Sequence, residues 1–341
     1  MTFARPSLTR DDLAPLAREA LGPTRRLDTV TRLRGGSKKG VYRLTLDDGS
    51  TAIAYVWSPD EDYWDAPPAD SRDPFSHASG LDLFRASHDR LTALGIRTPR
   101  LLLADSGHTH LRADAAIVED LPGGTLEELL RRDPHAAAPA LQDLAAILTA
   151  MRDRTAPRFG KIAVVDDGGS AHGTSCEAVV RDRALRDTEE AAAREPRLAA
   201  VRDRLVHRLD ELFMAVRPRP HHTLVHGELG PDHVLLDTDG RPALIDIEGL
   251  MYFDAEWEHV FLRLRFGPHY DALRTDGLDE DRLRLYRLAL HLSLVAGPLR
   301  LLDGDYPEPG PMRGIAEHNL ECALEFVRGR PARADVTWNA S

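Results

Sequence analysis

The sequence predicts an α+β protein with two lobes, a small β-rich lobe over residues 1–121 and a larger, mostly helical lobe over residues 122–341. Short apolar runs bounded by turn residues dominate the first part, which indicates strands. The rest of the chain reads mainly as helices with periodic apolar positions. The length of 341 residues accommodates either two domains or one large unit.

The composition excludes several classes of protein. Hydrophobic residues make up 42% of the chain and charged residues 29%, which is typical of a globular protein. No run approaches the roughly 18–20 uncharged apolar residues that a membrane span needs, and the N-terminus lacks the apolar stretch of a signal peptide. Cys176 and Cys322 form no CxxC pair, so we expect no disulfide framework or zinc ribbon and a reducing, cytoplasmic location. A net charge of −11 argues against nucleic-acid binding, whereas a partner protein stays open.

The first lobe begins with a predicted helix over residues 7–21, with Asp11 and Asp12 near its first turn. Three strands are then predicted over residues 30–33, 41–46 and 53–57, and the turn Asp47-Asp48-Gly49 joins the last two as a hairpin. A helix over residues 80–94 and strands over residues 100–105 and 115–120 complete the lobe.

Residues 58–80 are acidic, aromatic and proline-rich, and we interpret them as an irregular insertion. Within it, the acids and aromatics of residues 60–65 either form a solvated loop or face a cationic substrate.

The second lobe begins after the segment Leu121-Pro122-Gly123-Gly124, where Thr125 opens a helix. Helices then continue to the C-terminus, interrupted over residues 223–247. That interruption holds two short apolar strands, residues 234–236 and 243–245, around a turn.

Two local patterns carry chemistry. The first is the glycine-rich basic loop Arg34 to Gly40, which holds Lys38 and Lys39, two of the three lysines in the chain. The second is a polar cluster in which a strand delivers His226 and Glu228 into a loop, followed by His233 and, on a returning strand, Asp246. One carboxylate near a hydroxyl and another near a metal suit phosphoryl transfer. The alternative is a buried turn with capping acids.

These motifs resemble those of the aminoglycoside phosphotransferase family. The resemblance rests on His226-Gly227-Glu228, His233 and Ile245-Asp246-Ile247-Glu248, together with the segment Ile117 to Leu126 and the glycine-rich loop. It covers roughly residues 25–300 and implies a bilobal protein-kinase-like fold.

The resemblance also implies roles for individual residues. Glu228 and His226 fall in the catalytic motif, and Asp246 matches the acid that holds Mg²⁺. Glu119 and Leu121 fall where backbone groups hold adenine. The phosphate-covering loop consists of Gly35, Gly36, Ser37, Lys38, Lys39 and Gly40.

The sequence departs from the family pattern at three positions. Glu228 replaces the catalytic Asp, which lengthens the arm of the base by one methylene. His233 replaces the metal-binding Asn, and it either holds the metal in its place, although imidazole is a poor Mg²⁺ ligand, serves in catalysis, binds a phosphate, or leaves a second metal to Asp246, Glu248 or water. Tyr55 or Ala54 stands where the strand lysine is expected.

For the missing lysine and its acidic partner the sequence offers substitutes. Lys38 or Lys39 could reach the phosphates, or both are solvated loop charges, and Arg43 is another donor. Asp82 is the candidate for the helix acid that normally pairs with the strand lysine.

Further acids and histidines flank the motif. Asp254, Glu256, Glu258 and His259 either line the acceptor pocket or support the catalytic loop. His221 and His222 lack metal-ligand spacing, so we interpret them as structural or exposed.

The resemblance implies an enzyme that uses ATP, or another nucleoside triphosphate, with Mg²⁺ to phosphorylate a hydroxyl. The acceptor is a small molecule such as an antibiotic or metabolite, or a Ser or Thr of a natural-product precursor peptide. The alternative is a pseudokinase that binds a nucleotide or partner without phosphoryl transfer.

Overall fold

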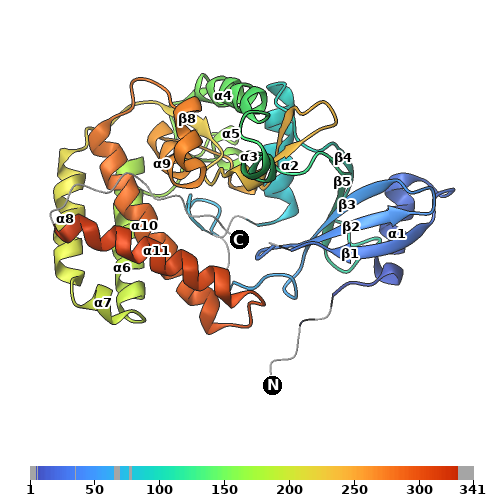
Figure 1. The fold of residues 1–341 in the computed structure, drawn as a ribbon, viewed down its shortest axis with the longest axis horizontal. Helices are drawn as coiled ribbons and strands as arrows, with labels where there is room; N and C mark the ends of the chain where they lie inside the picture. Colours follow the sequence, from blue (N-terminus) through green and yellow to red (C-terminus); the bar gives the residue numbers. More distant parts are fainter. Residues whose placement is uncertain (1–4, 6, 35, 65–69, 77–78, 329–341) are drawn as a thin grey trace. The chain divides into compact units, whose positions relative to one another are not determined.

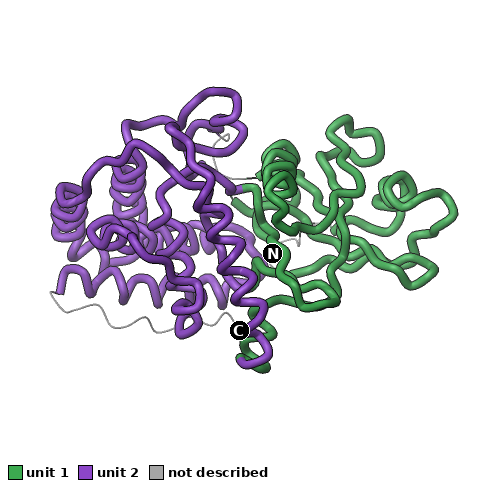
Figure 2. The backbone as a smooth tube through the Cα atoms, turned by 90° about the horizontal axis from the view of Figure 1, so that it is seen from above, with its two compact units in different colours: residues 1–66, 78–134, 232–248 green, residues 67–77, 135–231, 249–341 purple. Residues whose placement is uncertain are grey.

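The computed structural model describes residues 5, 7–34, 36–64, 70–76 and 79–328, and the chain packs into two compact units (Figures 1 and 2). The first unit comprises residues 1–66, 78–134 and 232–248, and the second comprises residues 67–77, 135–231 and 249–341. These units are not delimited as the predicted lobes are, and the lobe boundary at residue 121 stays a prediction.

The first unit is built on a five-stranded antiparallel sheet in the order β1-β2-β3-β5-β4. Its strands are β1 (Leu27–Arg32), β2 (Gly40–Leu46), β3 (Thr51–Trp57), β4 (Leu101–Asp105) and β5 (Asp114–Glu119). In β2 the side chains alternate, so that Tyr42, Leu44 and Leu46 are buried while Arg43 is exposed. The predicted strands and the hairpin turn before β3 are therefore confirmed.

Helix α1 (Arg10–Leu21) packs on this sheet, as Figure 1 shows. Leu13 and Leu16 of α1 are fully buried in a core that includes Leu44 and Ile117. Thr9 caps the helix and shares a capping box with Asp12, which explains why α1 begins three residues after the predicted start.

Two more helices and a hairpin complete the first unit. They are α2 (Leu81–Ala93), α3 (Leu126–Arg132), and the hairpin of β9 (Val234–Leu236) and β10 (Pro242–Leu244). Thr125, the N-cap of α3, forms a β-bridge with Leu235 of the hairpin. The 3₁₀ turns η1 (Pro231–His233) and η2 (Ile247–Gly249) flank the hairpin and contain His233 and Glu248 of the polar motif.

The predicted irregular insertion is divided between the two units. In the first unit Glu61 is 3% exposed and bonds to the Tyr42 hydroxyl and to Arg32, with Oε2 2.7 Å from Arg32 Nη2. For Glu61, both predictions made for residues 60–65 are therefore wrong. The Glu61 carboxylate neither lies in a solvated loop nor faces a cationic substrate, because it is buried and paired within the protein. Asp65 lies outside the described residues. In the second unit Phe75 packs against Phe253 and Trp257.

The second unit combines helices with a four-stranded sheet in the order β6-β8-β11-β7. The strands are β6 (Thr155–Ala156), β7 (Gly160–Lys161), β8 (His222–Val225) and β11 (Met251–Phe253). The helices are α4 (Ala138–Arg152), α5 (Ile162–Asp166), α6 (Cys176–Ala192), α7 (Pro196–Ala199), α8 (Arg202–Ala215), α9 (Ala255–Phe266), the 3₁₀ helix η3 (Gly267–Ala272), α10 (Glu280–Asp303) and α11 (Pro309–Arg328).

Helix α10 is long and apolar enough to cross a membrane by length and composition, but 61% of that apolar window is buried within the protein. It packs against α6, α8, α9 and α11, and Leu285, Leu288 and Leu292 are fully buried there (Figure 1). These contacts are those of a core helix.

Candidate functional site

In the first unit the glycine-rich loop delivers Lys39 to the acids of the polar motif. Lys39 directly precedes β2 and is 9% exposed. Its Nζ lies 3.0 Å from Asp246 Oδ1 and also donates to Glu248 Oε1. The same Nζ lies 5.1 Å from the centroid of the Tyr55 ring, which provides a cation–π contact. One lysine therefore bridges two carboxylates above an aromatic ring.

The charges of this cluster support one another. Burial alone lowers the pKa of Lys39, but the attraction of Glu248 and Asp246 outweighs burial and raises that pKa. Burial raises the pKa of Asp246, but the positive charge of Lys39, followed by His233 and Lys38, outweighs burial and holds the pKa well below its usual range. Lys39 and Asp246 are therefore both ionised at neutral pH.

Asp246 is also set apart by its backbone. It follows β10 and has a φ of 57°, in the left-handed region, where glycine is favoured and Asp is tolerated. Its side chain is 43% exposed, whereas that of Glu248 is 4% exposed. Backbone strain at an exposed carboxylate is frequent at functional sites, and here it presents Asp246 to solvent.

The glycine-rich loop itself is held by its neighbours. Ser37 accepts two hydrogen bonds from the insertion, one from Tyr63 N to its carbonyl oxygen at 2.9 Å and one from Trp64 Nε1 to its Oγ at 3.0 Å. Ser79 Oγ donates to the Lys38 carbonyl oxygen at 3.0 Å. A Cβ on Gly40 would lie 2.6 Å from Glu61 Cδ, so this glycine is required for close packing. Gly35 lies outside the described residues.

In the second unit, β8 leads into the loop His226-Gly227-Glu228. His226 is 1% exposed, whereas the Glu228 side chain is exposed. Gly227 has a φ of 91°, and a Cβ there would approach Met251 Cε at 3.3 Å. The backbone thus turns so that the imidazole points inward and the Glu228 carboxylate outward.

Side chains of helix α9 form hydrogen bonds with the backbone of this loop. Glu258 Oε2 accepts hydrogen bonds from the backbone N–H groups of His226 and Gly227, the latter at 3.2 Å. Trp257 Nε1 donates to the Gly227 carbonyl oxygen at 3.1 Å. Burial raises the pKa of Glu258 to about 7, against the opposing effect of the backbone N–H groups of the loop. Glu258 therefore supports the loop His226-Gly227-Glu228, and together with His259 it also lines a pocket in this unit.

The comparisons with known proteins decide the family. The family model described as the phosphotransferase enzyme family matches residues 29–290, which is most of the chain. The chain belongs to this phosphotransferase family. A search of curated proteins finds no match.

Solved structures of the phosphotransferase family and related kinases share the fold. Spectinomycin phosphotransferase APH(9)-Ia, in complex with ADP and spectinomycin, is 13% identical, with a TM-score of 0.61 over 95% of this chain and 98% of that one. Choline kinase LicA from Streptococcus pneumoniae is 13% identical, with a TM-score of 0.59 over 92% and 98%. A thermostable mutant of aminoglycoside phosphotransferase APH(4)-Ia is 16% identical, with a TM-score of 0.58 over 87% and 95%. At these identities the likeness establishes the bilobal, protein-kinase-like fold.

Against the phosphotransferase pattern, the structure distinguishes among the substitutes for the missing lysine. Tyr55 lies on β3 with its ring packed edge-on against Trp57 and Phe84. Of the candidate cations, Lys39 contacts Asp246, whereas Arg43 bonds to Asp120, with Nε 2.7 Å from Oδ2.

The acidic partner of the lysine differs from our expectation. Asp82 is exposed in the first turn of α2, so its predicted pairing is wrong. Glu248 pairs with Lys39 instead, because Lys39 approaches from the loop rather than from the strand. The sequence singled out Glu248 as a metal ligand and did not indicate this ion pair.

The remaining predicted site residues are placed as follows. His233 Nε2 lies 3.9 Å from Asp246 Oδ2 and 3.6 Å from Asp232 Oδ2, beyond hydrogen-bond distance. Glu119 ends β5, and its carboxylate accepts from Arg97 Nη2 and from Arg100 N, both at 3.2 Å. Leu121 is 5% exposed. Their roles in catalysis and in holding adenine stay predictions.

Proposed function

We propose that this protein is an ATP-dependent phosphotransferase that moves the γ-phosphate to a hydroxyl group of its acceptor. The observation that carries this proposal is the contact of Lys39 with Asp246 and Glu248. It supplies, from the glycine-rich loop, the cation that the phosphotransferase pattern requires beside its metal-binding acid. Membership of the phosphotransferase family supports the reaction class. The ADP of the spectinomycin phosphotransferase complex supports a nucleotide as the donor.

The residues of the first unit fit Mg²⁺. Asp246 offers a half-exposed carboxylate, and Glu248 Oε2 is a buried oxygen that has no hydrogen-bond partner among the described residues. Carboxylate oxygens are the ligands that Mg²⁺ prefers, whereas imidazole is a poor one, so His233 suits a phosphate oxygen better. Asp246 and Glu248 would hold this ion, which would supply positive charge against the nucleotide phosphates.

The protein's own residues divide the remaining work. Lys39 binds phosphate oxygens and orients them, and the backbone N–H groups of the glycine-rich loop cover the phosphates. Glu228 orients the acceptor hydroxyl and takes its proton, because it is the exposed carboxylate of the loop. A loose transition state depends on positioning more than on covalent chemistry, so Glu in place of Asp is compatible with turnover.

The chemical class of the acceptor remains to be chosen between a small molecule and a peptide. Two of the similar structures are described with small acceptors in their names, spectinomycin and choline. We therefore favour a small-molecule hydroxyl over a Ser or Thr of a precursor peptide. We also propose a reducing, cytoplasmic location, which the two free cysteines support.

The test begins with the nucleotide. Mg-ATP should raise the melting temperature of the protein, and slow ATP hydrolysis should be lost in Asp246→Asn and reduced in Glu228→Gln. Asp239→Asn, in an exposed turn of the same unit, is the matched control and should behave as wild type. Mass spectrometry after incubation with Mg-ATP and candidate alcohols, among them aminoglycosides, macrolides, nucleosides and Ser-containing peptides, would identify the acceptor. A protein that neither binds nor hydrolyses ATP would contradict the proposal.

A further inference from the structure

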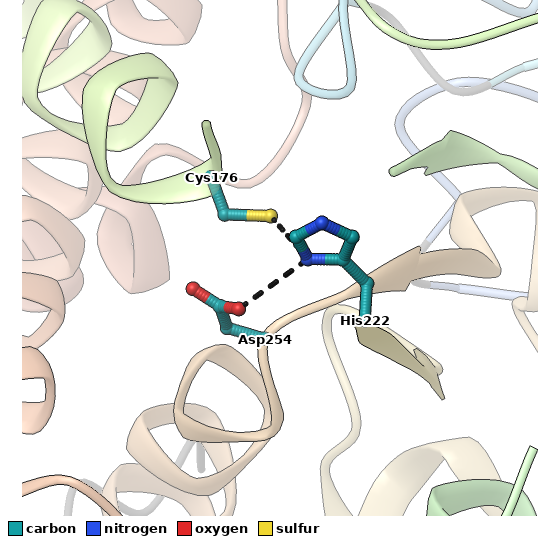
Figure 3. A group of neighbouring side chains, drawn as sticks. All are labelled: Cys176, His222 and Asp254. Atoms are coloured by element: carbon teal, nitrogen blue, oxygen red, sulfur yellow. Dashed lines mark hydrogen bonds and ion pairs between the residues drawn. The ribbon is translucent and has the colours of Figure 1, made fainter. Parts of the chain in front are cut away.

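A buried cluster in the second unit brings together a thiol, an imidazole and a carboxylate (Figure 3). Cys176 is the first residue of α6, His222 the first of β8, and Asp254 the N-cap of α9. Cys176 and Asp254 are 0% exposed and His222 is 7% exposed. The three residues are far apart in the sequence, so no spacing motif indicates them.

Hydrogen bonding leaves this cluster incomplete. His222 Nδ1 lies 3.3 Å from Cys176 Sγ and 3.6 Å from Asp254 Oδ1. A neutral imidazole Nδ1 carries either one proton or one lone pair, so it can serve only one of these two atoms. Asp254 Oδ1 is buried and has no hydrogen-bond partner among the described residues, since Arg219 Nε lies 3.7 Å from it, beyond hydrogen-bond distance. A buried carboxylate oxygen in that state indicates a missing ion or water.

Two of the three separations between the ligand atoms are close to those of a tetrahedral metal site. Metal–ligand bonds of ~2.3 Å to sulfur and ~2.0–2.2 Å to nitrogen and oxygen place tetrahedral ligand pairs roughly 3.4–3.6 Å apart. The observed separations of 3.3 Å and 3.6 Å lie within a few tenths of an ångström of these values, and all three ligand atoms lie within 4.8 Å of one another.

The surroundings also balance the charge of a divalent cation. Three buried carboxylates, Glu177, Asp254 and Glu256, are paired with two guanidiniums, which leaves one negative charge in excess. Replacing the thiol proton by a divalent cation adds one net positive charge and neutralises the group. Arg282 and the Tyr286 hydroxyl donate to Asp254 Oδ2, which fixes the carboxylate with its Oδ1 toward His222.

We propose that Cys176, His222 and Asp254 provide three protein ligands for a Zn²⁺ ion. Thiolate, imidazole and carboxylate together are the donors that zinc accepts, and the thiol releases its proton to solvent when the metal binds. The ion joins the first residue of β8, which leads to His226, with the N-cap of α9, which carries Glu258. It therefore anchors both elements that hold the catalytic loop.

The test is metal analysis of the purified full chain. We expect about one zinc per chain by inductively coupled plasma mass spectrometry. Chelation should lower the melting temperature, and added zinc should restore it. Replacement by Co²⁺ should produce a thiolate-to-cobalt charge-transfer band in the near ultraviolet. Cys176→Ser should lose both the zinc and the band, and Asp254→Asn should weaken zinc binding by about 10–100-fold.

Two controls separate this site from the others in the chain. Cys322→Ser removes the other cysteine, whose Sγ lies 3.8 Å from His318 Nε2, and should keep the band. Asp246→Asn should keep it as well, and excess Mg²⁺ should not displace it, so the outcome is independent of the proposed phosphotransferase activity. Substoichiometric zinc, no band in wild type, or a band that survives Cys176→Ser would overturn the proposal. If Cys176→Ser does not fold, the wild-type stoichiometry, the cobalt band and the Cys322→Ser control still decide it.

Discussion

The glycine-rich loop of the first unit and the loop His226-Gly227-Glu228 of the second unit are held by different physical interactions. In the first unit, Lys39 meets Asp246 and Glu248 through opposite charges, and one of the two carboxylates is half-exposed. In the second unit, the loop His226-Gly227-Glu228 is held by hydrogen bonds between its backbone and buried side chains of α9, with Gly227 N donating to Glu258 and Trp257 donating to the Gly227 carbonyl oxygen. Ion pairs with an exposed partner can exchange for a ligand, whereas buried backbone bonds cannot. The cluster around Lys39 in the first unit can therefore exchange its contacts, whereas the loop of the second unit is fixed.

Lys39→Ala should have the largest effect on activity, and it tests whether the ion pairs of Lys39 can exchange for a ligand. Removal of the ammonium leaves two neighbouring carboxylates without their cation and the phosphates without a donor. We expect kcat/KM for ATP to fall by about 100–1,000-fold. Lys38→Ala, which removes the neighbouring charge, is the matched control and should cost much less. Steady-state ATP hydrolysis measures both, and equal losses in the two variants would contradict the assignment.

A lysine placed on strand β3 would test whether Lys39 substitutes for the missing strand lysine. Tyr55 stands at the place of the strand lysine, with its ring 5.1 Å from the Lys39 ammonium. Tyr55→Lys combined with Lys39→Ala should recover a measurable fraction of the ATP hydrolysis lost in Lys39→Ala. Tyr55→Phe alone should change little, because the ring and its cation–π contact are kept. A strong loss in Tyr55→Phe would show that the hydroxyl has a role of its own.

Glu258→Gln tests the support of the loop His226-Gly227-Glu228 through the pH dependence of stability. The pKa of Glu258 is about 7 in the folded chain against an ordinary value of 4.5, so the folded state keeps this proton longer as the pH rises. Wild type should therefore lose stability relative to Glu258→Gln between pH 4.5 and 7, by up to about 3 kcal/mol in the free energy of unfolding. Denaturant titrations at several pH values measure the difference. Glu280→Gln, on the surface of the same unit, should show no such pH dependence.

The Gly40→Ala substitution challenges the packing beneath the glycine-rich loop. The added methyl group would overlap the carboxyl group of Glu61 and the ring of Tyr42, at 2.6 Å and 2.7 Å. We expect a loss of about 1–3 kcal/mol in the free energy of unfolding, read from denaturant titration. Gly49→Ala, at a turn with open space around it, would cost stability only through its φ of 79°.

The sequence predicted the elements that depend on local periodicity and the motif that depends on residue order. It located β1 to β5, the hairpin and the residues His226, Glu228 and Asp246. It could not pair Lys39 with Glu248 or Cys176 with His222, because those contacts join segments far apart in the chain. The burial of Glu61 was also beyond prediction, since an acid in a proline-rich stretch is normally solvated, and only the approach of Arg32 and Tyr42 reverses that expectation.

The smallest expected effects come from a matched pair of tryptophans, one in each unit. Trp64 donates its indole N–H to Ser37 Oγ at 3.0 Å, and Trp257 donates its own to the Gly227 carbonyl oxygen at 3.1 Å. The change to Phe removes one hydrogen bond in both, worth about 1 kcal/mol, and at the buried Trp257 it also removes packed side-chain volume. If the first unit binds the nucleotide and the second positions the acceptor, Trp64→Phe should raise KM for ATP a few-fold, whereas Trp257→Phe should lower kcat a few-fold at saturating ATP. Reversed effects would contradict this division between the two units.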